Sequence, residues 1–180
     1  MMEGPTLDGW LEDLAAGTPA PGGGSAAALA GALSGALVVM VARLTTGRKP
    51  YAAVQARVDE ILAEANTLRA ELRRLMDEDA VAYARVGSAS KPAKDDALLG
   101  AIQTPLAMAR GATRLIALAR EIAEIGNPNA RSDAKVGEML ARAALAAAVE
   151  NVKVNVAMLS RPEMGKALVE ETERLERSVR

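Results

Sequence analysis

One carboxylate interrupts an otherwise apolar row of residues. Between residues 54 and 86, apolar side chains recur at alternating steps of four and three, which places them on one face of a helix, and Asp79 occupies one of these positions. A carboxylate among aliphatic neighbours loses hydration free energy unless it is paired or takes part in a reaction. Asp79 is therefore either a buried partner for a Lys, an Arg or a helix N-terminus, or a functional acid. The pattern leaves both interpretations open.

Two asparagines occupy a comparable position. Asn151 and Asn155 are four residues apart and continue the face that carries Gly137, Ala144 and Ala148. Amides on an apolar face need hydrogen-bond partners. By default we expect them to bond each other or backbone groups across a bundle, and ligand contact is the alternative.

Two junctions between loops and helices are better candidates for ligand contacts. In the first, glycines and a serine precede an uncharged helical segment, so backbone N–H groups at the helix start can approach a carboxylate or phosphate. The second is a polar turn that leads into another helix. Each pattern also describes a tight turn with a helix cap. The residues are Gly22, Gly23, Gly24 and Ser25 in the first junction, and Gly126, Asn127, Pro128, Asn129, Ser132 and Asp133 in the second.

The residue types that the chain lacks exclude several chemistries. It has no His and no Cys, which removes thiolate nucleophiles, imidazole bases, disulfides and the ordinary zinc sites. Catalysis must use carboxylates, Lys, Arg, amides, hydroxyls or helix ends, and we expect no metal. The net charge is -1 and aromatic residues make up 2%. Nucleic-acid binders need a basic face with stacking positions, so we expect no nucleic-acid partner.

The elements that position these residues are predicted to be helices. The chain is 50% apolar with 2% aromatics, which favours helices packed through Ala, Leu, Val, Ile and Met, and 180 residues fit one domain, 1–180. We expect an all-α bundle of five or six helices with two long central helices. Such long apolar seams are buried more easily against a second copy, which predicts a homodimer. The expected helices run from Leu7 to Ala16 with Thr6 as cap and Gly17 as stop, from Ser25 as cap to Thr45, from Val54 to Val86, from Asp95 to Ile125 with a bend at Pro105, and from Ser132 to Leu159. A capping box from Ser160 to Glu163 then predicts a last helix that ends at Val179.

One segment imitates a membrane span. Residues Ala26 to Ala42 carry no charge, which approaches the length that a bilayer requires. The segment is rich in Ala, Gly and Ser, and Gly31 and Gly35 would let another helix approach closely, so we expect it inside a soluble bundle or dimer, with no membrane partner. Residues 1–5 lack the pattern of a secretion signal, which predicts a cytoplasmic protein.

In order and spacing, several segments resemble the cyclodeaminase/cyclohydrolase family. This family includes the C-terminal domain of formiminotransferase-cyclodeaminase and stand-alone methenyltetrahydrofolate cyclohydrolases. The matching segments span nearly the whole chain. They are residues 18–28, 40–42, 44–51, 77–80 with Ala82 and Tyr83, Pro105 with Leu106, 126–130 with Ser132 and Asp133, and Asn151 with Val152 and Asn155.

The resemblance implies a dimeric helical fold and a tetrahydrofolate substrate. Members either hydrolyse the 5,10-methenyl bridge to 10-formyltetrahydrofolate or eliminate ammonia from 5-formiminotetrahydrofolate to make that bridge. No formiminotransferase domain is found in these 180 residues, so we expect the hydrolase. The alternatives are a cyclodeaminase that releases ammonia and a non-catalytic folate-binding or scaffold protein.

The resemblance also implies roles for the candidate residues. The methenyl bridge is an amidinium cation, so its hydrolysis needs an oriented water, a base and a proton donor for the leaving nitrogen. Asp79 is the first candidate for the catalytic carboxylate and Asp133 the second. The expected substrate-binding residues are Gly22, Gly23, Gly24, Ser25, Asn127, Asn129, Ser132, Asn151 and Asn155, with Lys49 or Arg48 meeting the carboxylates of the glutamate tail.

Overall fold

The computed structural model describes residues 6–179, so the expectation for residues 1–5 lies outside the described part. Within that part the chain forms six α-helices, four short 3₁₀ turns and no strand, which confirms the predicted all-α class. The helices are α1 Leu7–Ala15, α2 Gly23–Thr45, α3 Gln55–Ser88, α4 Lys94–Ile125, α5 Arg131–Ala157 and α6 Lys166–Ser178. The 3₁₀ turns are Lys49–Val54, Lys91–Ala93, Pro128–Ala130 and Pro162–Gly165.

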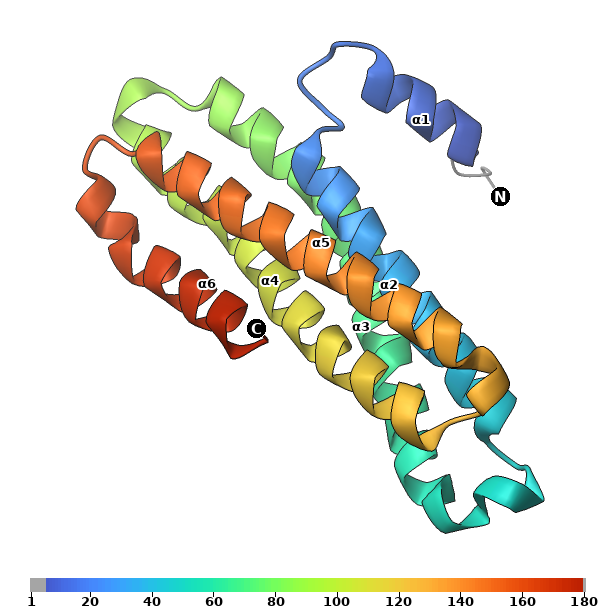
Figure 1. Ribbon diagram of the computed structural model, residues 1–180. Helices are drawn as coiled ribbons and strands as arrows, with labels where there is room; N and C mark the ends of the chain where they lie inside the picture. The colour runs from blue at the N-terminus through green and yellow to red at the C-terminus, as the bar shows by residue number, and fades with distance from the viewer. Residues whose placement is uncertain (1–5, 180) are drawn as a thin grey trace.

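Helices α2 to α5 lie side by side as an elongated bundle (Figure 1). Helix α4 packs mainly on α5, and α2 packs on both α3 and α5. Helix α6 runs along the outside of α4 and α5, whereas α1 projects from the end where α2 begins. The two long helices predicted from the apolar seams are α3, with 34 residues, and α4, with 32.

Small residues bring the central helices close together. A Cβ atom on Gly31 would lie 3.0 Å from a methyl group of Leu72, and one on Gly35 would lie 2.9 Å from the Cβ atom of Arg69. Both glycines belong to α2, and the residues they face belong to α3. The helix that was predicted to approach Gly31 and Gly35 closely is therefore α3. Leu72 is 1% exposed and lies in the main core.

A second, smaller core holds the other end of α3 against α4 and α5. Val86 of α3, Ile102 and Leu106 of α4 and Val152 of α5 are buried together there. This cluster fixes the part of α3 that follows Asp79, and therefore the walls of the candidate site described below.

Helix boundaries follow the predicted caps in some places. Thr6 caps α1, because its hydroxyl accepts a hydrogen bond from the Gly9 N–H at 3.1 Å. Gly17 has a φ of 72°, a left-handed conformation that glycine adopts without strain, as expected for a helix stop. Helix α4 begins one residue earlier than expected and continues through Pro105.

Two predicted caps are wrong. Gly22 is the N-cap of α2, and Ser25 lies inside the first turn of the helix rather than before it. The capping box after Ser160 does not form, because a 3₁₀ turn intervenes and α6 begins at Lys166. Instead, the Ser160 N–H donates to the Asp95 carboxylate at 2.9 Å and its hydroxyl also donates to that carboxylate, which ties the start of α4 to the segment after α5.

Helix α2 is long and apolar enough to cross a membrane, with a mean hydropathy of 2.0 in its most apolar window. In the structure, 61% of that window is buried. Most of this apolar segment is therefore buried in the core of the bundle.

Candidate active site

Asp79 lies on α3 against the first turn of α2. The Ser25 hydroxyl is 3.2 Å from Oδ2 of Asp79 and 3.1 Å from the carbonyl oxygen of Met76, and it donates to both. The Ser25 backbone N–H also donates to the Asp79 carboxylate. A Cβ atom on Gly24 would lie 2.5 Å from Cγ of Asp79 and closer still to Oδ1, so only glycine leaves room for the carboxylate here.

Burial and hydrogen bonding have opposite effects on the pKa of Asp79. Burial raises the pKa of the Asp79 carboxyl above its ordinary range, and this effect outweighs the two hydrogen bonds from Ser25, which lower the pKa. The positive end of the α2 dipole also favours the ionised form. Within residues 6–179 no Lys or Arg pairs with Asp79, so the helix N-terminus, not a cation, is its structural partner.

A cavity of about 220 Å³ adjoins this carboxylate. The backbone of Gly22 to Gly24 forms one wall, and Asn151 and Asn155 of α5 form another. The two amides do not bond each other. Asn151 Nδ2 donates to the Ala147 carbonyl of its own helix at 2.8 Å, which leaves Oδ1 for another partner, and the Asn155 side chain has no hydrogen bond within the described residues.

Tyr83 is a cavity residue that the prediction of site residues missed. It lies one helical turn after Asp79, lines the same cavity and is 54% exposed. An exposed aromatic ring beside polar groups can stack on a flat heterocycle. The spacing of four residues from Asp79 on one helix is the signal that could have identified it.

The structure separates the predicted site residues into two groups. Asp79 lies with Gly22, Gly23, Gly24, Ser25, Asn151 and Asn155. The second polar turn lies at the opposite end of α2, about 30 Å away at 1.5 Å per residue from Ser25 to Thr45. Within a single chain the two groups therefore do not line one pocket, and the substrate-binding roles of the second group stay predictions. The residues at the far end are Arg48, Lys49, Asn127, Asn129, Ser132 and Asp133.

Asn127 forms hydrogen bonds that hold the turn at that end of the bundle. Its backbone N–H donates to the Thr45 hydroxyl at 2.9 Å, and Nδ2 donates to the Leu44 carbonyl at 3.2 Å. Its Oδ1 accepts from the Asn129 N–H at 3.0 Å. These hydrogen bonds form a tight turn that joins the end of α2 to the start of α5. They agree with the interpretation of this junction as a turn with a helix cap, which was the alternative to ligand contact. Asp133 lies beyond it in the first turn of α5.

No cluster of three or more Asp, Glu, His or Cys residues within residues 6–179 is arranged to hold a metal ion. The cavity offers one carboxylate with a raised pKa, a helix N-terminus, the Asn151 Oδ1 atom, the Asn155 amide and an aromatic ring. This arrangement can bind a small polar molecule and move a proton at one atom of it.

The structure is a helical bundle in which one carboxylate, that of Asp79, lines a small cavity beside the start of α2. The chain belongs to the formiminotransferase-cyclodeaminase family, whose model matches residues 6–174.

Comparisons with individual proteins agree with that assignment. The chain is 39% identical to a methenyltetrahydrofolate cyclohydrolase from Methylorubrum extorquens, over 83% of this chain and 78% of the relative. It is 29% identical to the mouse formimidoyltransferase-cyclodeaminase over 84% of this chain, but spans only 30% of that longer protein. Among solved structures, formiminotetrahydrofolate cyclodeaminase from Thermotoga maritima superposes with a TM-score of 0.91, at 28% identity, over 97% of this chain and 89% of the other.

Proposed function

We propose that this protein is a methenyltetrahydrofolate cyclohydrolase. The observation that carries the proposal is the Asp79 carboxylate, whose pKa burial raises and which faces a cavity instead of pairing with a cation. A lone carboxylate complements a cationic substrate and can accept a proton from water. The similarity to a cyclohydrolase at 39% identity supports the same reaction.

The reaction can be written with the residues of this cavity. Ionised Asp79 accepts a proton from a water molecule as the water oxygen bonds to the bridge carbon of the amidinium ion. The carbon–N5 bond of the adduct then breaks, N5 takes up one proton and the carbon becomes the formyl group on N10. One proton is released overall. Asn151 Oδ1 and the Asn155 amide have free hydrogen-bonding capacity to orient the water or the pterin.

A direct assay tests the reaction. Purified protein is mixed with 5,10-methenyltetrahydrofolate, and loss of the methenyl absorbance is followed against the uncatalysed rate. We expect a protein-dependent loss with 10-formyltetrahydrofolate as product. Binding of the folate without any change in the bridge would instead indicate a non-catalytic folate-binding protein.

The second candidate is the cyclodeaminase reaction, which the structural similarity to the Thermotoga maritima protein favours. It differs in its leaving group, because ammonia departs from the formimino carbon as the bridge forms. Supplying 5-formiminotetrahydrofolate and measuring ammonia together with a gain of methenyl absorbance separates the two activities.

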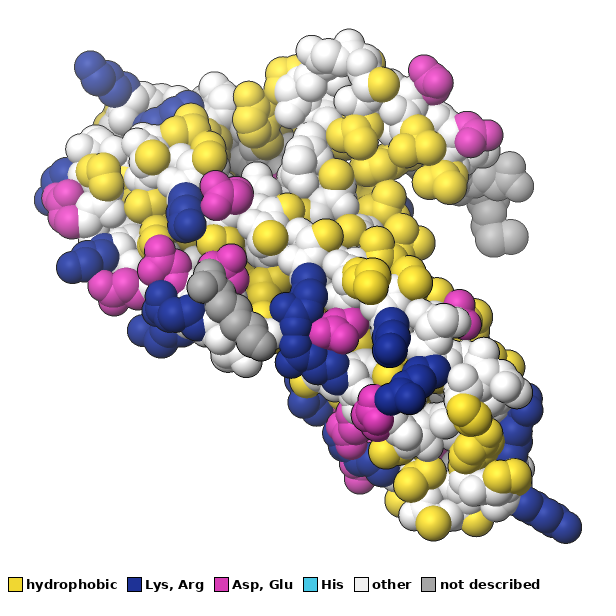
Figure 2. All heavy atoms as spheres, in the orientation of Figure 1, with side chains coloured by type: hydrophobic (Ala, Val, Ile, Leu, Met, Phe, Trp, Pro, Cys, Tyr) yellow, Lys and Arg dark blue, Asp and Glu magenta, His cyan; other side chains and the backbone are white. Residues whose placement is uncertain are grey.

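We also propose that the protein is a homodimer. Exposed apolar side chains on α2 and α5 include Leu33 (49% exposed) and Met139 (65% exposed). A hollow of about 370 Å³ lies beside Leu33, between α2 and α3, and is lined by apolar side chains together with Arg69 and Arg73. Figure 2 shows apolar side chains gathered below α1, near the start of α2. An apolar area of this kind is typical of an interface.

The position of Leu33 suggests how two copies are related. It lies near the midpoint of α2, so a two-fold axis beside it would bring the Asn127 end of one protomer toward the Asp79 cavity of the other. Molar mass measured by light scattering should correspond to a dimer, and Leu33→Glu should shift it toward the monomer. A monomeric wild-type protein would contradict the proposal.

A further inference from the structure

Helix α1 carries apolar side chains that its own bundle covers only in part. Trp10 is 9% exposed and joins the main core with the partly buried Leu14, whereas Leu7 is 63% exposed and Leu11 is 48% exposed. Leu7 and Leu11 are one helical turn apart and form an apolar row on the surface of α1. In Figure 2 the apolar side chains on the lower side of α1 face an open notch beside the bundle. Another surface can therefore pack on this row.

An acidic row lies beside the apolar one. Asp8 and Glu12 are also one turn apart, and each directly follows a leucine of the apolar row. Both residues are exposed, as is Asp13, and none of the three forms an ion pair within residues 6–179. Helix α1 contains no Lys or Arg. A surface complementary to α1 therefore combines apolar side chains with cations.

A surface with these properties lies at the other end of the bundle. Met40 of α2 is 37% exposed and Val136 of α5 is 46% exposed. They lie at similar heights along the bundle, because a Cβ atom on Gly137 of α5 would be 3.5 Å from the Cβ atom of Leu37 of α2. Exposed cations flank both side chains in the sequence. We call the following four residues the far-end patch: Met40, Arg43, Lys135 and Val136.

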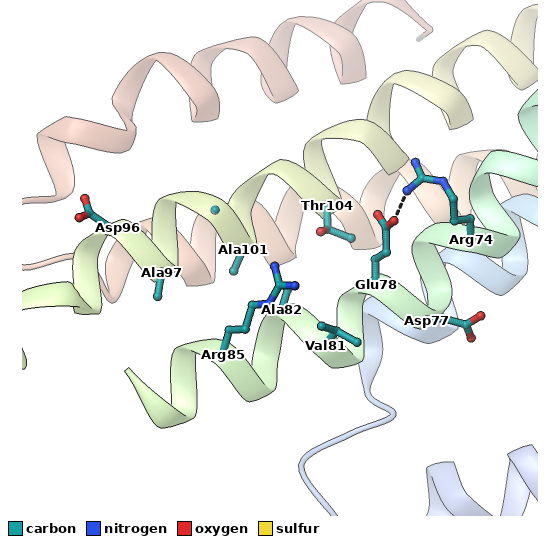
Figure 3. A pocket seen from close by; sticks show the side chains of 11 residues that line it. Arg74, Asp77, Glu78, Val81, Ala82, Arg85, Asp96, Ala97, Ala101 and Thr104 are labelled. Carbon is teal, nitrogen blue, oxygen red and sulfur yellow. Dashed lines mark hydrogen bonds and ion pairs between the residues drawn. The ribbon is translucent and has the colours of Figure 1, made fainter. Parts of the chain in front are cut away.

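The two cations of this patch have no partner in their own chain. Arg43 and Lys135 form no ion pair within residues 6–179. Many charged side chains elsewhere on the bundle pair within the chain, as Arg74 does with Glu78 in the groove between α3 and α4 (Figure 3). The acidic row of α1 and the cations of the far-end patch are thus unpaired groups of opposite charge.

Two-fold symmetry can place these two surfaces opposite each other. Gly23, where α2 begins, is ten residues before Leu33, and Arg43 is ten residues after it, so each lies about 15 Å from Leu33 along the helix. A two-fold axis that crosses α2 at right angles beside Leu33 therefore sets the partner's Arg43 beside the start of α2. Helix α1 projects from that same end of the bundle (Figure 1).

We propose that α1 of each protomer is an arm that packs on the far-end patch of its partner. The apolar row lies against the apolar side chains of the patch, and the acidic row lies against its cations. This inference rests on the proposed homodimer and not on the proposed reaction.

The arm is joined to the candidate active site. The segment between α1 and α2 supplies Pro19, Ala20 and Gly22 to the wall of the cavity beside Asp79. Packing of α1 on the partner therefore holds one wall of that cavity in place.

Cross-linking between two introduced cysteines tests the contact, since the chain has no Cys of its own. Leu11→Cys is combined with Met40→Cys, and the purified double variant is treated with a short bis-maleimide. Within one chain the two positions are kept apart by α2, which measures about 26 Å from Gly23 to Met40. A cross-link between them therefore joins two chains, and we expect a dimer band on a denaturing gel.

Matched controls show whether that band is specific. Leu11→Cys with Arg174→Cys places the second thiol at an exposed position on α6. This variant and the two single-cysteine variants should run as monomers on the denaturing gel. A band of equal strength in these controls would reject the contact.

A charge swap tests the acidic row without cross-linking. Glu12→Lys and Arg43→Glu should each raise the Kd of the dimer about tenfold, because each brings like charges together. The double variant restores opposite charges and should return to within about threefold of wild type. Glu170→Lys makes the same change at an exposed position on α6 and should leave the Kd unchanged. Light scattering over a dilution series measures these values.

Failure of the arm and failure of the homodimer give different results. A wild-type protein that is monomeric in solution contradicts both. In a folded dimer, absence of the cross-linked band rejects the arm alone, and so does a double charge variant that recovers no better than the single ones. Neither of these two results bears on the proposed reaction.

Discussion

Gly24 and Asp79 are in direct contact across two helices. The missing side chain of Gly24 leaves the space that the Asp79 carboxyl group occupies, and a Cβ atom there would lie 2.5 Å from Cγ of Asp79. The first turn of α2 therefore packs directly against the turn of α3 that carries Asp79. The place of the carboxylate in the cavity depends on a residue 55 positions away in the sequence.

Gly24→Ala should displace the Asp79 carboxylate. We expect the added methyl group to lower the free energy of unfolding by about 1–3 kcal/mol, as overpacking does elsewhere, and to reduce turnover. Chemical denaturation and the hydrolysis assay measure the two effects. Gly23→Ala is the matched control, because a Cβ atom at Gly23 meets nothing within 4 Å and should leave stability unchanged or slightly higher. Equal stability of the two variants would contradict the contact.

Asp79→Asn should be at least as stable as wild type at pH 7. Burial raises the pKa of Asp79 in the folded state above its unfolded value, so wild type loses stability as pH rises from the ordinary Asp range through the raised pKa. The neutral amide avoids that loss and can still accept hydrogen bonds from Ser25. Thermal denaturation across this pH range should therefore show the largest advantage of the variant at neutral pH and none at low pH. A variant much less stable than wild type at pH 7 would mean that the carboxylate serves the fold.

Ser25→Ala should shift the pH dependence of the reaction. The Ser25 hydroxyl lowers the pKa of Asp79 through its hydrogen bond, so removing it leaves burial less opposed and raises that pKa. Because the reaction needs ionised Asp79, the acidic limb of the pH profile of kcat/KM should move to higher pH. An unchanged limb with reduced rate would show that another group controls it.

Tyr83→Ala should weaken substrate binding. Its exposed ring lines the cavity, and a flat pterin would lose the stacking contact, so we expect a higher KM with little change in stability. Tyr83→Phe retains the ring and should behave like wild type. Equal KM values for the Ala and Phe variants would exclude stacking.

Sequence patterns predicted what one helix determines by itself. The apolar steps of α3 identified Asp79 as an exception, and the caps at Thr6 and Gly17 depend on neighbouring backbone groups only. Which helix ends meet depends on packing, so the sequence could not show that Asn127 and Asp133 lie at the opposite end of α2 from Asp79 in the same chain. The serine at Ser160 matched a capping pattern but bonds Asp95, which is 65 residues away.

The hydrolysis rate of Asp79→Asn shows whether this carboxylate takes part in the reaction. Turnover of 5,10-methenyltetrahydrofolate is compared among wild type, Asp79→Asn and Glu71→Gln, the last an exposed carboxyl on the same helix. Thermal denaturation confirms that all three are folded. We expect a fall in kcat of at least about 100-fold for Asp79→Asn and wild-type turnover for Glu71→Gln. A folded Asp79→Asn protein with wild-type turnover would exclude Asp79 from the reaction.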